Sequence, residues 1–324
     1  MSTSINSDDY IDAVTEGINR VGIDSEIHKC ANCGKEGSEV SNTCNKCKSV
    51  MYCNAACKKK HRKKHKKACE RRVTELHDEK LFKQPPPLED CPICFLRMPS
   101  LESGQIYMAC CGKVICSGCI HAVQSRATKK EHNICPFCRT PNPTTNEEVI
   151  KQFEKRIELN DATAICDMGC KYAEGLLGLP QNRAKALELW HRAAELGDAD
   201  AYCNLGIAYD NGDGVQRDET KAAYYYELAA IRGDSYARAN LGVESLEKGD
   251  KDRALKHWMI TVKDGEYRSL QNIKCIYMDG HVTKDDYAKA LRSYRAYLDE
   301  IKSDQRDEAA AANDRHRYYE SVLM

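Results

Sequence analysis

Cys30-Ala-Asn-Cys33 begins a series of closely spaced cysteine pairs that decides how residues 30–138 fold. Fifteen of the chain's nineteen cysteines lie in two consecutive blocks of this kind, and one histidine joins them. Two residues between cysteines let both thiolates reach one tetrahedral zinc from a tight turn, and eight ligands complete two such sites. The candidate ligands are Cys30, Cys33, Cys44, Cys47, Cys53, Cys57, His65 and Cys69 in the first block, and Cys91, Cys94, Cys110, Cys111, Cys116, Cys119, Cys135 and Cys138 in the second. The sequence therefore predicts four structural zinc ions.

The length and composition favour a protein of two or three domains in a reducing compartment. The chain has 324 residues, begins without a basic and then apolar signal, and contains no apolar window that would span a membrane. An odd number of cysteines without such a signal favours metal binding over disulfides, which are the alternative. We therefore expect a cytoplasmic or nuclear protein.

The net charge is zero, but residues 58–67 form a basic run, Lys-Lys-Lys-His-Arg-Lys-Lys-His-Lys-Lys. Such a run can bind nucleic acid or act as a nuclear address. It lacks the aromatic side chains that usually accompany nucleic-acid binding. Candidate ligands four residues apart flank and interrupt the run. The sequence therefore favours the solvated face of a ligand-bearing helix over a nucleic-acid-binding segment or a nuclear address.

The predicted fold class is multidomain, with two small cross-braced zinc-binding modules followed by an all-α helical-repeat solenoid. A flexible leader with a helical stripe occupies 1–27, and the first zinc finger occupies 28–72. A helix and proline linker follows over 73–89, and the second zinc finger covers 90–140. Helical repeats are expected over 151–303 and a C-terminal capping helix over 304–324.

The second half of the chain repeats itself. Its Lys-Ala or Arg-Ala landmarks at 185, 221, 253 and 289 are separated by 36, 32 and 36 residues, a period typical of stacked helical hairpins. The recurring Gly169, Gly206 and Gly242 would let helices approach closely. The rings expected to fill the gaps between hairpins belong to Tyr172, Tyr209, Tyr225 and Trp190. Over about 160–300 the pattern resembles the Sel-like branch of the tetratricopeptide-related repeats.

Gly197 and Gly233 are expected to end helices with a left-handed backbone. The four cysteines of this half, Cys166, Cys170, Cys203 and Cys275, lack metal-ligand partners and are expected to pack inside the repeats.

The first cysteine block resembles the MYND-type zinc finger. Spacing alone leaves His61 beside His65 as a possible ligand, although seven cysteines and one histidine suffice for two sites. The resemblance implies His65 and interleaved sites, with Cys30, Cys33, Cys53 and Cys57 on one zinc and Cys44, Cys47, His65 and Cys69 on the other. Family fingers bind proline-rich peptides, commonly with Gln and Trp where this chain has Lys58 and Arg62.

The second block resembles a RING finger, because Cys91-Pro-Ile-Cys94 and Cys135-Pro-Phe-Cys138-Arg139 bracket its other cysteines. Lys113 stands where the family usually has a histidine ligand, which indicates an all-cysteine variant. The resemblance implies one zinc on Cys91, Cys94, Cys116 and Cys119, and another on Cys110, Cys111, Cys135 and Cys138. Sites closed by four protein ligands leave no open position for water, so no catalytic residue is expected.

The resemblance also implies three residues that bind a ubiquitin-conjugating enzyme. Ile93 matches the hydrophobic docking residue, Pro136 the proline of the same groove, and Arg139 the cation that bridges ubiquitin and the enzyme. The alternative is that Ile93 and Pro136 only shape zinc-binding loops and that Arg139 is an ordinary surface cation.

The leading hypothesis is a RING-type ubiquitin ligase or adaptor, with a conjugating enzyme on the RING and a protein substrate on the repeats. A non-catalytic scaffold with structural zinc is the alternative, and nucleic-acid binding through 58–67 is a third. The sequence gives no indication of the oligomeric state.

Overall fold

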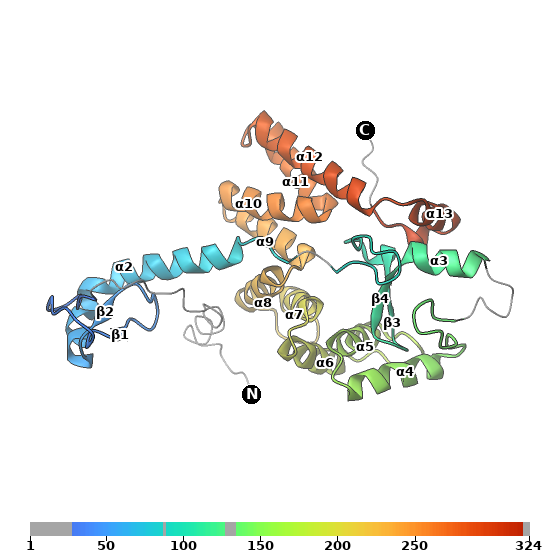
Figure 1. Ribbon diagram of the computed structural model, residues 1–324, viewed down its shortest axis with the longest axis horizontal. Coiled ribbons are helices and arrows are strands. Elements are labelled where there is room, and N and C mark those ends of the chain that lie inside the picture. The colour runs from blue at the N-terminus through green and yellow to red at the C-terminus, as the bar shows by residue number, and fades with distance from the viewer. Residues whose placement is uncertain (1–27, 87–88, 127–133, 320–324) are drawn as a thin grey trace. The chain divides into compact units, whose positions relative to one another are not determined.

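The computed structural model describes residues 28–86, 89–126 and 134–319 (Figure 1). The predicted leader over 1–27 lies outside the described residues. The chain divides into two compact units, residues 1–83 and 84–324, and each is described by itself. Among the described helices, none combines the length and the apolar character needed to cross a membrane.

The first unit holds the first cysteine module (residues 28–83), which has one strand pair and one long helix. β1 (Asn42–Thr43) pairs with β2 (Met51–Tyr52) in antiparallel fashion, and α2 (Ala55–Leu81) follows. Asn54 begins α2 because its side chain accepts a hydrogen bond of 2.9 Å from the Cys57 N–H. Apart from three cysteines, the buried cluster contains only Val40 and Tyr52. So few apolar side chains cannot stabilise a module of this size unaided.

The second cysteine module (residues 89–143) is built on a β-hairpin. β3 (Gln105–Met108) pairs with β4 (Lys113–Cys116), so that Gln105 faces Cys116 and Met108 faces Lys113. η1 (Glu102–Gly104) precedes the hairpin, and α3 (Ser117–Arg126) follows directly. Its buried cluster contains Met98, Ile115 and Ile120, and the rest of that cluster is cysteine. This module therefore also depends on its sulfur ligands for a core.

The helical array follows, and each helix packs against the next along the chain. Its elements are α4 (Asn146–Glu158), α5 (Ala162–Glu174), α6 (Arg183–Glu195), α7 (Ala199–Asn211), α8 (Glu219–Ile231), α9 (Ser235–Glu247), α10 (Lys251–Thr261), η2 (Val262–Asp264), α11 (Tyr267–Met278) and α12 (Lys284–Ile301). Asp161, Asp198 and Asp234 recur as N-caps whose carboxylates accept first-turn N–H groups. Gly197 and Gly233 follow helices with φ of 93° and 105°, which confirms their predicted left-handed backbone.

Three glycines let aromatic rings press directly on helix backbones. A Cβ atom at Gly169 would lie 2.7 Å from Trp190, one at Gly206 would lie 2.6 Å from Tyr226, and one at Gly242 would lie 2.3 Å from Trp258. The predicted close approach at these glycines is therefore confirmed.

The rings that press on these glycines are only partly those expected. Trp190 is among them, whereas Tyr209 and Tyr225 stack on each other with ring centroids 5.4 Å apart. Tyr226, next to Tyr225 in the sequence, is the side chain buried against Gly206. The rotation of the helix about its axis decides which of the two adjacent tyrosines faces inward. A repeat pattern does not locate inward-facing positions to within one residue, so it could not distinguish the two tyrosines.

The second cysteine module contacts both ends of the helical array, as Figure 1 shows. At one end, Tyr107 of β3 donates a hydrogen bond of 2.8 Å to Asp161, the N-cap of α5. At the other end, Arg97 donates to Asp264 in η2 and to Glu300 in α12. The helices therefore form an arc whose two ends are joined through this module.

The C-terminal helix differs from the predicted capping helix over 304–324. α13 (Asp304–Ala312) ends at Asn313, which is extended, and η3 (Asp314–His316) follows. Instead of covering the last repeat, α13 packs mainly against α3 of the second cysteine module. Gly118 permits this packing, since a Cβ there would lie 2.8 Å from the Arg306 side chain. Residues 320–324 lie outside the described part of the chain.

Candidate metal centres

Four of the five CxxC pairs fold as the same tight turn. In each, the N–H of the residue after the second cysteine donates to the C=O of the first cysteine at 2.9–3.0 Å. These residues are Gly34, Lys48, Phe95 and Arg139, and all have a φ between 55° and 76°. Only glycine adopts this backbone without strain, so three other residues are held there by their surroundings. Coordination of both cysteines by one metal ion would supply that constraint.

The first cysteine module brings eight side chains into two interleaved tetrads, with the ligand atoms of each tetrad within 4.8 Å of one another. One tetrad is Cys30, Cys33, Cys53 and Cys57, and the other is Cys44, Cys47, His65 and Cys69. Three members, Cys57, His65 and Cys69, come from α2, whose spacing of four and eight residues repeats one helical face. His65 points its Nε2 atom at the second tetrad, 3.2 Å from Cys47 Sγ.

The second cysteine module forms two further tetrads on the same distance criterion. One is Cys91, Cys94, Cys116 and Cys119, and the other is Cys110, Cys111, Cys135 and Cys138. The adjacent Cys110 and Cys111 follow β3 directly, and both reach the same tetrad. Lys113, at the position where the resemblance expects a histidine, begins β4 and is exposed. The tetrad is thus complete without it.

The sulfur separations fit zinc and exclude disulfides. A Zn–S bond of about 2.3 Å places tetrahedral sulfurs about 3.8 Å apart, whereas a disulfide bond is about 2.05 Å long. The Sγ–Sγ distances are 3.7 Å for Cys33 and Cys53, 3.6 Å for Cys44 and Cys69, 3.8 Å for Cys94 and Cys116, and 3.9 Å for Cys111 and Cys135. All the cysteines are free. The four tetrads are positioned to bind metal ions, and their donor sets are consistent with zinc.

Neighbouring thiols of the first tetrad differ in the direction of their pKa shifts. Burial raises the pKa of Cys30, but hydrogen bonds from the backbone at Cys33 and Cys53 outweigh it and lower this pKa to about 6. Burial and the neighbouring Cys57 thiol raise the pKa of Cys53 to about 12. Without a metal, a thiolate at one position keeps the neighbouring thiol protonated, because two negative charges at this distance would repel each other. A divalent cation removes that conflict and lets all four sulfurs ionise.

Several polar side chains touch the ligand sulfurs. Asn32 Nδ2 donates a hydrogen bond of 3.3 Å to Cys57 Sγ, and the Thr140 hydroxyl lies 3.2 Å from Cys138 Sγ. Such contacts orient ligands and tune their affinity for metal. Because each tetrad already provides four protein ligands, no position remains for a reactive water. The arrangement is that of structural centres.

Besides the tetrad member His65, two residues of the basic run have structural roles in the first cysteine module. Lys58 Nζ donates hydrogen bonds of 2.9 Å to Thr43 O and 2.7 Å to Asn45 Oδ1. His61, which spacing left as a possible ligand, lies outside the tetrad. Its ring stacks on His65 with centroids 5.8 Å apart. The lysines at 59, 60, 63, 64, 66 and 67 are exposed, as expected for the solvated face of a helix.

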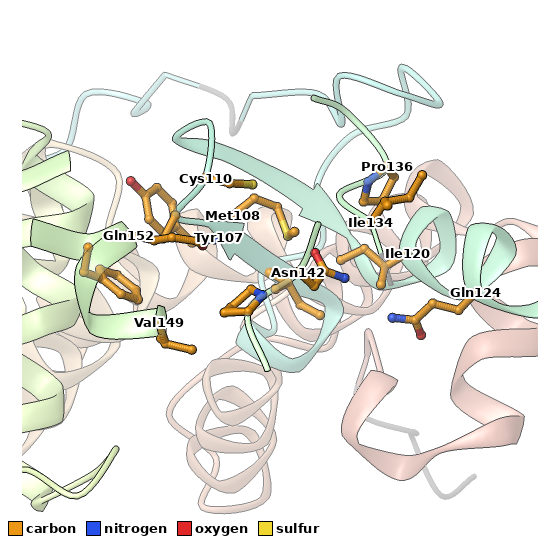
Figure 2. Close-up of a pocket in the computed structure, with 14 residues that line it drawn as sticks. Tyr107, Met108, Cys110, Ile120, Gln124, Ile134, Pro136, Asn142, Val149 and Gln152 are labelled. Atoms are coloured by element: carbon orange, nitrogen blue, oxygen red, sulfur yellow. The ribbon is translucent and has the colours of Figure 1, made fainter. Parts of the chain in front are cut away.

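The three predicted docking residues lie on the metal-binding turns of the second cysteine module. Ile93 is half-buried against the module's core, and Arg139 is exposed. Pro136 is half-buried in the wall of a cavity of about 330 Å³, which also involves Ile120 of α3 and Val149 of α4 (Figure 2). The pocket therefore lies where this module meets the first helix of the array.

Two exposed aromatic residues on the same turns were not singled out from the sequence. Phe95 follows Cys94 and is 76% exposed, and Phe137 lies between Cys135 and Cys138 and is 44% exposed. A small metal-binding module has little apolar core in which an aromatic residue inside or directly after a CxxC turn could be buried. That reasoning would have identified both as surface residues.

The cysteines of the helical array belong to none of the metal-ligating groups found among the described residues. Cys166 and Cys203 are buried, and Asn204 Nδ2 donates to the sulfurs of Cys166 and Cys170 at 3.5 Å each. Cys275 is exposed, so the packing role expected for it is wrong. It lies on the exposed side of α11, outside the matched Sel1 repeats.

Comparisons with known proteins support this organisation. Residues 30–69 match the MYND finger family, and residues 162–198 and 199–234 match the Sel1 repeat family. A solved Sel1 repeat protein from Oxalobacter formigenes is 26% identical with a TM-score of 0.41, and the match covers 60% of this chain and 72% of that one. The two family matches and the four tetrads show N-terminal zinc-binding cysteine clusters followed by a Sel1-like helical repeat region, which confirms the predicted fold class.

Among curated proteins, the chain is distantly similar to E3 ubiquitin-protein ligases. GW2 of Oryza sativa, in subspecies indica and japonica, is 32% identical over 107 residues, which is 31% of this chain and 24% of GW2. DA2 of Arabidopsis thaliana is 38% identical over 69 residues, which is 21% of this chain and 16% of DA2. The chain therefore spans about a quarter or less of the length of these relatives.

Proposed function

We propose that the second cysteine module is a RING-type module that docks a ubiquitin-conjugating enzyme, and that the helical array holds a protein substrate. One observation carries the proposal: accessible apolar and cationic side chains stand on two metal-binding turns. Ile93 and Phe95 belong to one turn, and Phe137 and Arg139 to the other. The distant similarity to E3 ubiquitin-protein ligases supports the same function.

The turns suit a docking role because their backbones are closed by hydrogen bonds while Phe95 and Phe137 are exposed. Exposed aromatic residues are typical anchors of protein interfaces. A guanidinium at Arg139 can donate several hydrogen bonds at once to carbonyl groups of two proteins. Such a ligase positions a ubiquitin-charged enzyme and forms no covalent intermediate itself, so closed metal centres are compatible with the function.

The helical array would bring the substrate to the docked enzyme. Sel1-like repeats indicate protein–protein interaction, since stacked hairpins present extended surfaces. Both ends of the array contact the second cysteine module, through Asp161 at one end and Asp264 at the other. Two attachment points leave little freedom for a hinge, so a substrate on the array would keep a fixed distance from the docked enzyme. The first cysteine module would add a further protein contact.

The experiment is an autoubiquitination assay of the full zinc-loaded chain with a panel of conjugating enzymes. Ile93→Ala and Arg139→Ala should each reduce the product at least about tenfold, the effect of losing one well-made contact. Lys113→Ala is the matched control, because the Lys113 side chain is exposed at the start of β4 in the same module and is not one of the proposed docking residues. Absence of product from the native chain with every enzyme would rule out ligase activity.

Pro136 favours a second candidate, a non-catalytic interaction scaffold. This proline lines a pocket shared with Val149 of α4, so part of its surface faces the helical array and not a partner. Titration of the full chain with conjugating enzymes distinguishes the two functions. A ligase should show binding that Ile93→Ala weakens, and a scaffold should show none that depends on Ile93.

A further inference from the structure

A buried arginine from the C-terminal helix lies against the second cysteine module. Arg306 is fully buried in the first turn of α13. Its Nη1 atom donates hydrogen bonds of 2.9 Å to Arg97 O and 2.6 Å to Ile301 O, and its Nη2 atom lies 3.9 Å from Cys94 Sγ. Within the described residues, Arg306 belongs to no ion pair, and its buried Nε atom has no hydrogen-bond partner. A cation buried without an anion is costly, so its neutralisation needs an explanation.

A candidate anion in contact with Arg306 is the tetrad of Cys91, Cys94, Cys116 and Cys119, through Cys94 Sγ. Four thiolates around one divalent cation carry two net negative charges. The cysteines at 91, 116 and 119 are buried, so solvent screens these charges poorly. The guanidinium and the metal-loaded tetrad would therefore compensate each other's charge within the same buried region.

We propose that Arg306 is a positioning cation of this metal centre, so that metal binding by the Cys91 tetrad and docking of residues 303–318 stabilise each other. The tetrad would hold the arginine in place by its charge, and the arginine would slow loss of the metal. The proposal requires only that the tetrad binds zinc, and it is independent of ligase activity.

The packing around Arg306 supports such mutual dependence. In the sequence, Gly118 lies between the ligands Cys116 and Cys119. A Cβ there would lie 2.9 Å from the Arg306 backbone nitrogen. The first turn of α13 thus rests on the ligand-bearing segment itself. The preceding residue, Gln305, places its Oε1 atom 3.9 Å from Cys119 Sγ. Two consecutive side chains of α13 therefore reach two sulfurs of one tetrad.

The chain beyond α13 continues along the same module. The Ser117 hydroxyl donates a hydrogen bond of 3.2 Å to His316 O, and the Ser103 hydroxyl donates to Arg317 O. Tyr318 is 1% exposed, and a Cβ at Gly104 would lie 2.8 Å from its Cβ. These contacts involve the start of α3 and η1, so disorder of the metal site would loosen the whole C-terminal segment.

The test follows release of zinc site by site in the full zinc-loaded chain. A chelator is added with an alkylating reagent, and mass spectrometry measures how fast each cysteine is modified. Arg306→Met should speed modification of the Cys91 tetrad about tenfold or more, as is usual when an outer contact of a metal site is lost. Arg306→Lys keeps the charge and should restore retention towards the native rate.

The matched control is Arg238→Met in α9, because Arg238 is also almost fully buried and donates a hydrogen bond to a backbone oxygen, Ala230 O, but no hydrogen bond among the described residues joins it to a tetrad sulfur. This change should leave modification of the Cys91 tetrad at the native rate. The proposal is wrong if Arg306→Met has no effect on that rate, if Arg238→Met accelerates it equally, or if lysine at 306 protects no better than methionine.

A reciprocal measurement uses the native chain alone. Hydrogen–deuterium exchange of residues 304–312 should rise when the chelator empties the Cys91 tetrad, while exchange of α7 and α8 stays unchanged. Persistent protection of residues 304–312 after that zinc is lost would overturn the coupling even if the variants failed to fold.

Discussion

Arg97 and Asp264 lie 167 positions apart in the sequence, yet Arg97 Nη2 is 2.8 Å from Asp264 Oδ1. The two side chains are 19% and 14% exposed, so the ion pair is mostly shielded from water. The same guanidinium reaches Glu300 at 2.7 Å and lies over the Tyr297 ring, 5.2 Å from its centroid. This cluster ties the second cysteine module to the last helices of the array.

Arg97→Met should destabilise residues 84–324 by roughly 3 kcal/mol, since it leaves the Asp264 carboxylate buried without its partner. Denaturant unfolding of the zinc-loaded chain measures the loss. Arg217→Met is the control, because the pair of Arg217 with Glu219 is 63% and 77% exposed. Exposed pairs contribute little, so the control should change stability by less than about 1 kcal/mol. Equal effects of the two changes would contradict a special role for Arg97.

Gly242→Ala should cost about 3 kcal/mol, at the upper end of the usual range for overpacking. The new methyl would lie 2.3 Å from Trp258 Nε1, and that N–H is already held by Ala239 O at 3.1 Å. The ring therefore cannot move aside easily. Unfolding in denaturant gives the free-energy change.

Gly280→Ala provides the comparison for that change. Position 280 has no neighbouring atom within 4 Å but has a φ of 74°, so only the backbone cost of about 1 kcal/mol should be seen. A loss at 242 no larger than the loss at 280 would show that Trp258 tolerates the methyl.

Removal of one ligand should remove one zinc ion. Cys69→Ala leaves Cys44, Cys47 and His65, which can no longer close a four-ligand site. Elemental analysis should fall from about four zinc ions per chain to about three, and a chelator should unfold both cysteine modules because structural zinc supplies much of their folding free energy. Cys275→Ala is the control, since this exposed cysteine belongs to no tetrad. Loss of zinc from the control, or none from Cys69→Ala, would contradict the assignment.

His257 should make the helical array sensitive to acid. Burial, with the charges of Arg238 and Arg253, lowers the pKa of His257 from 6.5 to about 3. Above pH 6.5 the histidine is neutral in both states, and its contribution to stability is complete. As the pH falls towards 3, the unfolded chain takes up a proton that the folded chain does not. Stability should therefore fall by about 1.4 kcal/mol for each pH unit.

The check compares the pH dependence of unfolding in the native chain and in His257→Gln between pH 7.5 and 5.5. The variant should show a shallower loss, while His281→Gln at an exposed position should follow the native curve. The metal sites are also acid-sensitive, but they are the same in all three proteins. Identical curves for all three would exclude His257 as the titrating group.

The candidate ligands in both cysteine modules follow closely from the sequence, because CxxC spacing and helical spacing are local properties, whereas their pairing into sites was implied by the family resemblances and is seen in the tetrads of the structure. His65 and Cys69 lie one helical turn apart, and their order along the chain reproduces the interleaved arrangement of a known family. His61 shows the limit of local reasoning. It has the same spacing as a ligand, and only the packing of its ring on His65 and the contact of its Nδ1 with Tyr52 place it beside the site.

Contacts between distant segments could not be predicted in the same way. Pro136 faces a pocket completed by α4, and α13 leaves the array to rest on Gly118. Each contact depends on how two distant segments of the fold pack together. No periodic pattern in a single sequence predicts that packing. A buried arginine such as Arg306 also reads, in the sequence, like any solvent-exposed charge on a helix.

The sequence by itself determined the sixteen candidate ligands and the repeating helices, because turns of two residues and a helical period fix short-range geometry, and resemblance to known families implied how the ligands pair. Only the tertiary structure decided that the two ends of the array meet the second cysteine module and that the C-terminal helix completes it. The physical reason is that shielded ion pairs such as Arg97 with Asp264, and close backbone packing such as that at Gly118, arise from the folded surfaces together.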